Sequence, residues 1–383
     1  MVSGDIRLPN RFQCSGILDE SDLLKLTRPG SPAAQEKEEA PLKLPTPRRM
    51  WKFVCQHLHL AAYFRSSGDG RSRHKIPAKD LLWSILLGTI LRQWAFLAIE
   101  ALVGSQVRRN LNVSQSFGDD ALRYFTERLD AAPTRAALAA VLHRAKRNKA
   151  FEDCRFVGLA LDGTTAGLRR KKGCCLCRPH RNAQREITGY RHHFVLAALI
   201  GGDLTLLVDV EPYGPGDSEY AAGQRLLHCV RANLGARFID YVVVDGEFAT
   251  APFLHAAGEA GWPVVARLKE NLPELSRAAK WRFHSRPSDL VFRDSPDRVE
   301  LWDADDFDPW ESLEWETVRV IRYRQYKPDG EVVEAYWLTN FSARQMSRRC
   351  LYAMAFCGDP RYVAFGPAQA VPAAALSRRT PHN

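Results

Sequence analysis

The strongest constraint on the fold is a series of short apolar segments between residues 156 and 268, each bounded by turn residues. Their length and their aliphatic, β-branched content are typical of buried strands, and the two segments between them with helical spacing end near glycine. A Gly-Gly-Asp sequence separates the second and third apolar segments as a hairpin signal. The predicted strands are 156–163, 194–200, 204–210, 238–246 and 262–269, and the predicted helices are 218–235 and 250–261.

This order, β-β-β-α-β-α-β, is a strand meander followed by α/β crossovers. It predicts an α/β fold with an RNase H-like mixed sheet and flanking helices, in which the first and fourth strands are neighbours. Asp162 ends the first strand (LALDG) and Asp245 ends the fourth (VVVDG). We therefore expect the two carboxylates to lie close together.

Two carboxylates at one edge of a sheet suit a hard divalent cation, because Mg²⁺ and Mn²⁺ prefer oxygen ligands. Two such ions can activate a water or a 3′-hydroxyl and stabilise the leaving oxygen in phosphoryl transfer. The structural alternative is that each Asp-Gly pair only turns the chain. Because the two pairs end strands that this topology places together, a Mg²⁺ or Mn²⁺ site at Asp162 and Asp245 is favoured.

The segments LALDGTT (159–165) and VVVDGEFATAPFLHAAGEAGWPVVARLKEN (242–271) resemble the DDE transposases of bacterial insertion sequences, and WLTNFSARQMSR (337–348) is similar to the approach to that family's last catalytic helix. The resemblance implies that Asp162 and Asp245 are the first two acids of the catalytic triad. It implies metal-dependent cleavage of donor DNA at the element ends and joining of the 3′ ends to target DNA. The implied partners are double-stranded DNA, at the element ends and at the target, and further copies of the chain assembled as a homo-oligomer on that DNA.

The family's third acid is a glutamate on a helix soon after this last segment, and no glutamate follows Glu334 here. Asp359 is the only later acid, and the Pro/Ala/Arg-rich sequence around it has no helical pattern. We interpret this as a C-terminal truncation or frameshift that leaves an aberrant tail within 341–383. Glu247, Glu331, Glu334 and Asp359 are poor substitutes, so the third acid stays unidentified and weak or absent strand transfer is expected.

Composition divides the chain into five regions. The first mixes charges with prolines and is expected to be loosely ordered, and the second carries helical patterns. The fourth is acid-rich, with a hairpin signal at Lys327-Pro-Asp-Gly330, and is expected to be separate from the first sheet. The regions are a lead-in (1–50), a helical, DNA-binding N-terminal region (51–150), the RNase H-like catalytic core (151–280), a β-rich insertion (281–340) and the end of the core with its tail (341–383).

Two stretches of the N-terminal region are helical in pattern. The first begins at Pro77 and reads as one buried helix or a helix pair. In the second, Asp119 or Asp120 is a suitable cap and Pro133 starts a new helix. The basic residues between 144 and 149 fit a solvated helix end or a phosphate-contacting surface.

A cysteine-rich basic segment, RRKKGCCLCRPHRN, follows the first predicted strand. Eight Lys or Arg residues and one Glu lie between positions 169 and 191, and such a loop beside the metal site suits a DNA backbone. Closely spaced cysteine and histidine can bind zinc, with His192 or His193 able to complete a site across the hairpin; the alternative is a basic loop with incidental thiols. The DNA-contact candidates are Arg169, Arg170, Lys171, Lys172, Arg191 and Lys269, the last by its family resemblance, and the zinc candidates are Cys174, Cys177 and His180.

Charge and cysteine content narrow the setting of the protein. The net charge of +10 favours a polyanionic partner. The nine cysteines without a secretory signal predict reduced thiols and a cytoplasmic protein. The longest apolar stretch, Leu81–Leu91, is too short for the ~20 residues that span a bilayer, so no membrane partner is expected.

The sequence therefore predicts an insertion-sequence transposase, inactive if the third acid is truly missing. Three alternatives stay open. The first is a DNA-binding transposase remnant or regulator without catalysis, the second is a metal-dependent nuclease of the same fold, and the third is a structural zinc protein.

Overall fold

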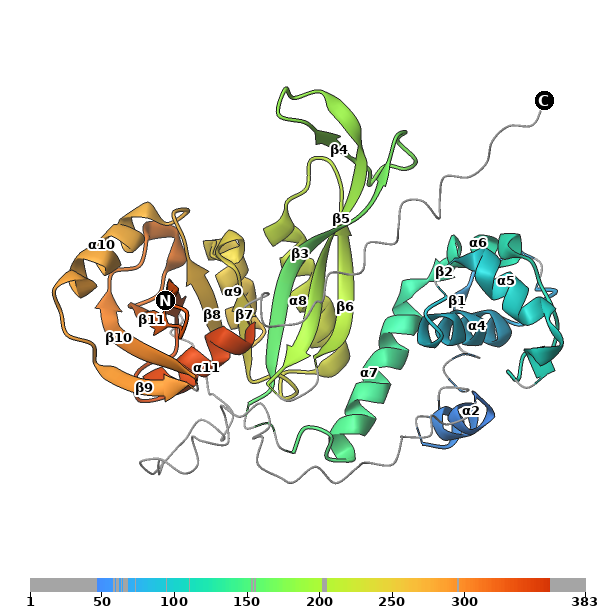
Figure 1. Cartoon of the computed structure of the whole chain (residues 1–383), viewed down its shortest axis with the longest axis horizontal. Coiled ribbons are helices and arrows are strands. Elements are labelled where there is room, and N and C mark those ends of the chain that lie inside the picture. The colour runs from blue at the N-terminus through green and yellow to red at the C-terminus, as the bar shows by residue number, and fades with distance from the viewer. Residues whose placement is uncertain are drawn as a thin grey trace. The chain divides into compact units, whose positions relative to one another are not determined.

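The computed structural model forms two compact units, residues 47–150 and residues 151–358, which are described separately (Figure 1). Most of the predicted lead-in lies outside the described residues, as does the tail with Asp359. Among the described residues, no helix is both long and apolar enough to cross a membrane. The structure describes residues 47–358 except positions 58, 60, 61, 63, 65–67, 73, 94, 110, 153, 155, 202–204 and 295.

The first unit is helical. The stretch after Pro77 is a helix pair, α4 and α5. The apolar residues of both helices, Leu81 and Val103 among them, are buried in one core. Gly118 rather than Asp119 or Asp120 caps α6, and a separate helix, α7, follows. The elements are α2 (Pro47–Gln56), α4 (Ala78–Ile90), α5 (Phe96–Gly104), η2 (Gln106–Arg109), α6 (Asp119–Thr126), α7 (Ala131–Arg147) and the antiparallel pair β1 (Gly68–Asp69) and β2 (Leu129–Asp130).

The second unit is a mixed α/β structure built on one large sheet. Ten strands of the described chain join in the order β4-β5-β3-β7-β8-β12-β11-β10-β9, with β6 paired to β5. The pairs β3–β7 and β7–β8 are parallel and the other pairs are antiparallel. The strands are β3 (Gly158–Arg169), β4 (Arg178–Arg181), β5 (Ile187–Ile200), β6 (Leu206–Tyr213), β7 (Tyr241–Val244), β8 (Val264–Leu268), β9 (Leu290–Asp294), β10 (Asp297–Phe307), β11 (Val318–Tyr326) and β12 (Val332–Thr339).

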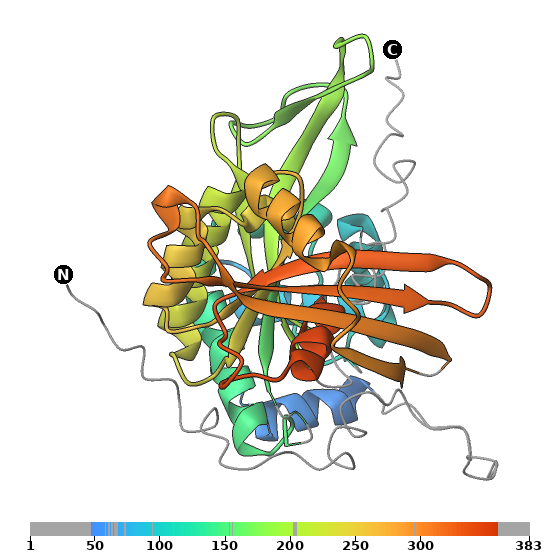
Figure 2. The ribbon, with the colours of Figure 1, turned by 90° about the vertical axis from the view of Figure 1, so that its left-hand side faces the viewer.

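Helices cover both faces of this sheet (Figure 2). Alternate residues of a strand face opposite sides. Thus Tyr241 and Val243 of β7 join the core beside α11, while α8 and α9 pack together on the other face. The helices are α8 (Glu219–Leu234), η3 (Gly246–Phe248), α9 (Ala251–Glu259), α10 (Pro273–His284), η4 (Glu311–Leu313) and α11 (Arg348–Gly358).

The expected neighbourhood of the first and fourth strands is confirmed, since β3 and β7 pair directly. Two other expectations are wrong. The first strand does not end at Asp162 but continues to Arg169. The acid-rich region is also not separate from the first sheet, because β12 pairs with β8 and carries β11, β10 and β9 onto the same sheet.

Beyond Asp162 the chain forms an arm, defined here as residues 166–191, which contains the outer ends of β3 and β5 together with β4. The arm extends past the rest of the sheet at the top of Figure 1. The register shifts between Ala166 and Arg169, which marks a bulge where the arm begins. Because β4 pairs only with β5, the arm is a narrow antiparallel ribbon with mostly exposed side chains.

Candidate active site

Two aspartates meet at the centre of the sheet because of the parallel register of β3 and β7. The last pair in that register is Leu161 with Val244, so Asp162 and Asp245 are the next residues on each strand. Asp245 is where β7 ends, and its carbonyl accepts a hydrogen bond from the backbone N–H of Phe248 at 3.1 Å. The pairing thus brings the two predicted acids together at one point of the sheet.

A third carboxylate, Glu219, joins them from α8, and sequence reasoning missed it. Ser218 caps the helix by accepting a hydrogen bond from the N–H of Ala221 at 3.3 Å, which places Glu219 in the first turn. The Glu219 carboxylate packs so tightly over Gly163 that a Cβ there would overlap it. The Tyr213 hydroxyl donates a hydrogen bond to Oε2 of Glu219 at 2.9 Å and fixes its direction.

The electrostatics confirm that these acids share one environment. Burial is the largest cause that raises the pKa of Asp162 to about 6, and the negative charges of Glu219 and Asp245 act in the same direction. The backbone N–H of Gly163 and the charge of Lys269 oppose this rise. Burial also raises the pKa of Glu219, with Glu247 and Asp245 adding to the effect. Like charges held together in this way are relieved by protons or by a bound cation.

A lysine and an asparagine contact Asp245 and the residue after it. The ammonium of Lys269, just after β8, pairs with the Asp245 carboxylate. Asn271 Nδ2 donates a hydrogen bond to the carbonyl of Gly246 at 2.7 Å. A Cβ on Gly246 would lie 2.8 Å from Cγ of Lys269, so a glycine is required for the lysine stem to cross the backbone here.

These residues fit a hard divalent cation by the chemistry of their donors, which are carboxylate oxygens from β3, β7 and α8. The three carboxylates are not close enough together to form a closed ligand cluster. No choice of one oxygen from each of Asp162, Asp245 and Glu219 places all three oxygens within 4.8 Å of one another. Lys269 neutralises Asp245 in this arrangement. A cation at Asp162 and Asp245 would therefore compete with the Lys269 ammonium.

Two of the acids considered from sequence as third ligands, Glu331 and Glu334, have other partners. Glu331 pairs with Lys327 at 2.6 Å, and Glu334 pairs with Arg322 at 2.8 Å and with Arg324 at 2.7 Å. Glu247, in contrast, lies close enough to Glu219 to raise the pKa of that carboxyl. The signal that could have found Glu219 is its place directly after the helix cap Ser218, which is visible in the sequence. An acid in the first turn of a helix is also explained by the helix dipole, so this signal is ambiguous.

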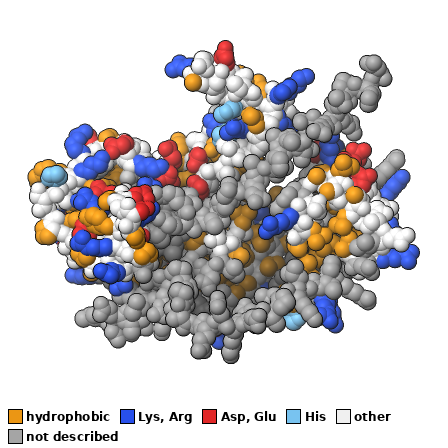
Figure 3. All heavy atoms as spheres, viewed as in Figure 1, with side chains coloured by type: hydrophobic (Ala, Val, Ile, Leu, Met, Phe, Trp, Pro, Cys, Tyr) orange, Lys and Arg blue, Asp and Glu red, His pale blue; other side chains and the backbone are white. Residues whose placement is uncertain are grey.

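The basic candidates lie mainly on the arm. Arg169, Arg170, Lys171 and Lys172 are exposed there, and Arg191 is half-buried on β5 opposite Arg178. Figure 3 shows Lys and Arg side chains standing on the arm. Of the zinc candidates, the structure brings Cys174 and Cys177 together with His192, while His180 lies on β4 opposite Gly189 and outside that group.

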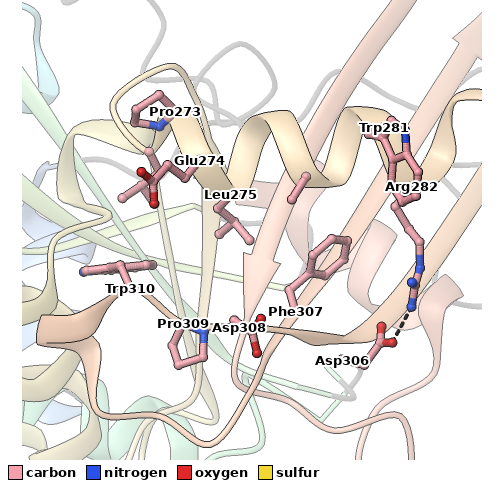
Figure 4. Close-up of a pocket in the computed structure, with 12 residues that line it drawn as sticks. Pro273, Glu274, Leu275, Trp281, Arg282, Asp306, Phe307, Asp308, Pro309 and Trp310 are labelled. Atoms are coloured by element: carbon pink, nitrogen blue, oxygen red, sulfur yellow. Dashed lines mark hydrogen bonds and ion pairs between the residues drawn. The ribbon is translucent and has the colours of Figure 1, made fainter.

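A pocket of about 510 Å³ lies elsewhere, between α10 and the end of β10 with the residues that follow it (Figure 4). Its walls are largely apolar, with Trp281 and Trp310 among them, and its acids are Glu274, Asp306 and Asp308. None of the predicted catalytic, DNA-contact or zinc residues lines it. An acidic rim of this kind does not suit a phosphate.

No family model matches this chain, and no curated protein matches its sequence. Among solved structures, the chain is similar to piggyBac transposase in a synaptic complex with hairpin DNA, with 12% identity and a TM-score of 0.37. The similarity covers 82% of this chain and 66% of that chain, so it spans slightly less than two thirds of the relative. A likeness at this level assigns no function to this chain.

Proposed function

We propose that this chain is a metal-dependent DNA phosphoryltransferase of the DDE kind, a transposase of the insertion-sequence type. The observation that carries the proposal is the meeting of Asp162, Asp245 and Glu219, with the pKa of Asp162 raised to about 6. Carboxylates that converge from three separate elements, two of them with raised pKa values, are expected at a catalytic site. The strand order, with a meander followed by parallel strands, supports the RNase H-like interpretation.

The carboxylates would hold Mg²⁺ or Mn²⁺. When bound, these ions would lower the pKa of an attacking water or 3′-hydroxyl and neutralise the leaving oxygen. Asp162 and Asp245 act as the central ligands because they lie on paired strands, and Glu219 acts as the third. Tyr213 holds Glu219 in place, and Lys269 is positioned to transfer from Asp245 to a DNA phosphate when the cation binds.

DNA would be bound through its backbone, by charge rather than by sequence. The arm supplies exposed cations beside the carboxylates, and phosphate contacts of this kind position a duplex without reading bases. The helical unit 47–150 is the proposed region for recognising the element ends. Two ends must be held together for transposition, so the active form is proposed to be a homo-oligomer on double-stranded DNA.

The test uses a plasmid that carries the gene with its flanking DNA, incubated with the full chain and Mg²⁺ or Mn²⁺. We expect nicks at discrete element ends and joined products, both lost in Asp162→Asn, Asp245→Asn and Glu219→Gln. Glu259→Gln removes an exposed acid from α9 and serves as the matched control. Mn²⁺ affinity, measured by calorimetry, should fall in the same three variants and not in the control.

Other outcomes decide between the alternatives. Gel shifts without cleavage in either metal would identify a DNA-binding remnant, favoured by the missing family glutamate. Nicks without joined products would identify a nuclease of the same fold. Unchanged Mn²⁺ affinity in Asp162→Asn and Asp245→Asn would overturn the proposed metal site.

A further inference from the structure

A second set of metal-binding side chains lies at the base of the arm, apart from the carboxylates. Cys174 and Cys177 occupy the turn before β4 with Cys-x2-Cys spacing, and His192 lies on β5. Their ligand atoms all lie within 4.8 Å of one another, and in the described part of the chain they form the one such group of His, Cys, Asp or Glu side chains. The residues come from two segments that β-pairing brings together.

The distances match those of a tetrahedral metal centre. The two sulfurs are 3.6 Å apart, and Nε2 of His192 lies 3.1 Å from Sγ of Cys174 and 3.2 Å from Sγ of Cys177. Zinc bonds of ~2.3 Å to sulfur and ~2.05 Å to nitrogen imply ~3.8 Å between sulfurs and ~3.5 Å between sulfur and nitrogen. The three atoms therefore need to move outward by only a few tenths of an ångström to hold the ion.

The chemistry of the donor set selects the metal. Cys177 is buried at 2% exposure, which keeps one sulfur of the group away from bulk solvent. Sulfur and imidazole together select zinc over the hard cations suited to the carboxylates.

We propose that Cys174, Cys177 and His192 bind one Zn²⁺, with solvent as the fourth ligand. In this proposal the ion holds the cysteine turn of the arm (residues 174–177) against Tyr213 and Gly214, which we call the wall of the carboxylate site because Tyr213 hydrogen-bonds Glu219. The inference stands on the arm's own geometry. Its primary readout is metal content, so it can fail or succeed independently of activity on DNA.

Two contacts join the cysteine turn to that wall. Leu176 packs on Gly214, where a Cβ would lie 3.3 Å from the Leu176 Cα. The guanidinium of Arg178 lies 5.2 Å from the ring centre of Tyr213, the residue that hydrogen-bonds Glu219. Both contacts involve residues within one position of a proposed zinc ligand, so the ion would limit their movement.

Strand β5 supplies the third link. Consecutive strand residues face opposite sides of a sheet. His192 turns to the sulfurs, while His193 places its Nδ1 3.5 Å from the Tyr213 hydroxyl. A zinc ion bound by one histidine would therefore hold the backbone that presents the other to the carboxylate site.

The experiment measures zinc in the full chain purified under reducing conditions, by inductively coupled plasma mass spectrometry. We expect about one zinc per chain, falling to background in Cys174→Ser, Cys177→Ser and His192→Ala. Cys175→Ser and His180→Ala are matched controls, because both residues lie in the same segment outside the cluster, and both should keep the zinc. Zinc removal with a chelator should increase hydrogen exchange in peptides covering the arm and Tyr213.

Cobalt titration of the zinc-free wild-type chain covers the case in which a variant does not fold. The expected result is a thiolate-to-cobalt charge-transfer band together with the strong visible bands of tetrahedral Co²⁺. A folded, reduced wild-type chain that holds no zinc and shows no such bands would overturn the proposal. So would zinc that survives His192→Ala but is lost in His180→Ala.

Discussion

Replacing Gly163 with alanine tests whether Glu219 belongs to the carboxylate cluster. Gly163 lies within β3 and its φ is outside the left-handed region, so alanine is compatible with its backbone. The added methyl would overlap the Glu219 carboxylate, which is held by Tyr213. The substitution therefore acts first on the contact with Glu219, whose atoms are the three nearest to the added methyl.

The magnitude follows from the cost of forcing a methyl group into a filled site. The atoms that the methyl meets are the end of a flexible side chain, so the glutamate can turn aside. The cost is then the hydrogen bond from Tyr213 that it gives up, about 0.5–1.5 kcal/mol. In a Glu219→Ala background the methyl meets no carboxylate, and Gly→Ala then stabilises by about 0.4–1 kcal/mol through the unfolded state. The two backgrounds should differ by roughly 1–2.5 kcal/mol in the effect of the same substitution.

A third background separates shape from charge. Glu219→Gln keeps the size of the side chain and removes its charge, so Gly163→Ala should remain costly there if the overlap is steric, whereas a cost due only to desolvation of the carboxylate would be lost. Gly258→Ala is the matched control, because this glycine is in α9 and a Cβ there meets nothing within 4 Å. It should stabilise the same unit by up to ~1 kcal/mol, the usual preference of a helix for alanine.

The assay is urea unfolding followed by hydrogen exchange and mass spectrometry on peptides from β3 and α8, which reports on the unit that carries the substitution. The reasoning is refuted if Gly163→Ala has the same effect in the wild-type and Glu219→Ala backgrounds. A zero coupling energy would mean that Glu219 does not lie over Gly163 and that the third carboxylate has been misassigned.

Three further predictions test the charges of the site. Burial holds the pKa of Asp162 at about 6 against an ordinary value of 3.8, so between pH 4 and 6 the native state keeps a proton that the unfolded state loses. The contribution of Asp162 to the free energy of unfolding should therefore fall as pH rises through this window. The difference between the wild type and Asp162→Asn in urea titrations at each pH should show that fall, and equal slopes in the two proteins would count against the assignment. Lys269→Met removes the ammonium that neutralises Asp245 and should tighten Mn²⁺ binding in calorimetry, while weaker binding would show that the lysine supports the metal instead. Replacing Arg169, Arg170, Lys171 and Lys172 with glutamine should reduce the salt slope of DNA binding by up to about 4 in fluorescence anisotropy, and an unchanged slope would remove the arm from the DNA interface.

The pairing of the two aspartates could be predicted from sequence, since it depends on local signals. The apolar segments and the Asp-Gly pairs identify the strands, and strand order places the first beside the fourth. What failed was the end of the first strand. Its residues after Asp162 include Thr164 and Thr165, which are compatible with a strand, but the Asp162-Gly163 pair indicates a turn, whereas in the structure the strand continues through it.

Contacts between distant segments could not be predicted in this way. The joining of β12 to β8 sets Trp337 opposite Arg267, and nothing local to either segment indicates that register. The choice of His192 over His180 as the neighbour of the cysteines depends on the same kind of pairing, because the register of β4 on β5 sets Arg178, next to Cys177, opposite Arg191, next to His192, and sets His180 opposite Gly189. Register is a property of the assembled sheet rather than of either strand.

The position of Glu219 changes the meaning of the missing family glutamate. The family's third acid would follow β12 in the chain, whereas Glu219 precedes β7, so all three carboxylates of the cluster come from a segment of the chain that ends at Asp245. If Glu219 is a metal ligand, Glu219→Gln weakens Mn²⁺ binding and the core needs no later acid to hold the ion. If Glu219 only raises the pKa of Asp162, the same variant lowers that pKa and leaves Mn²⁺ binding equal or tighter, because a like charge no longer opposes ionisation of Asp162. The two roles therefore predict opposite shifts in metal affinity from one substitution.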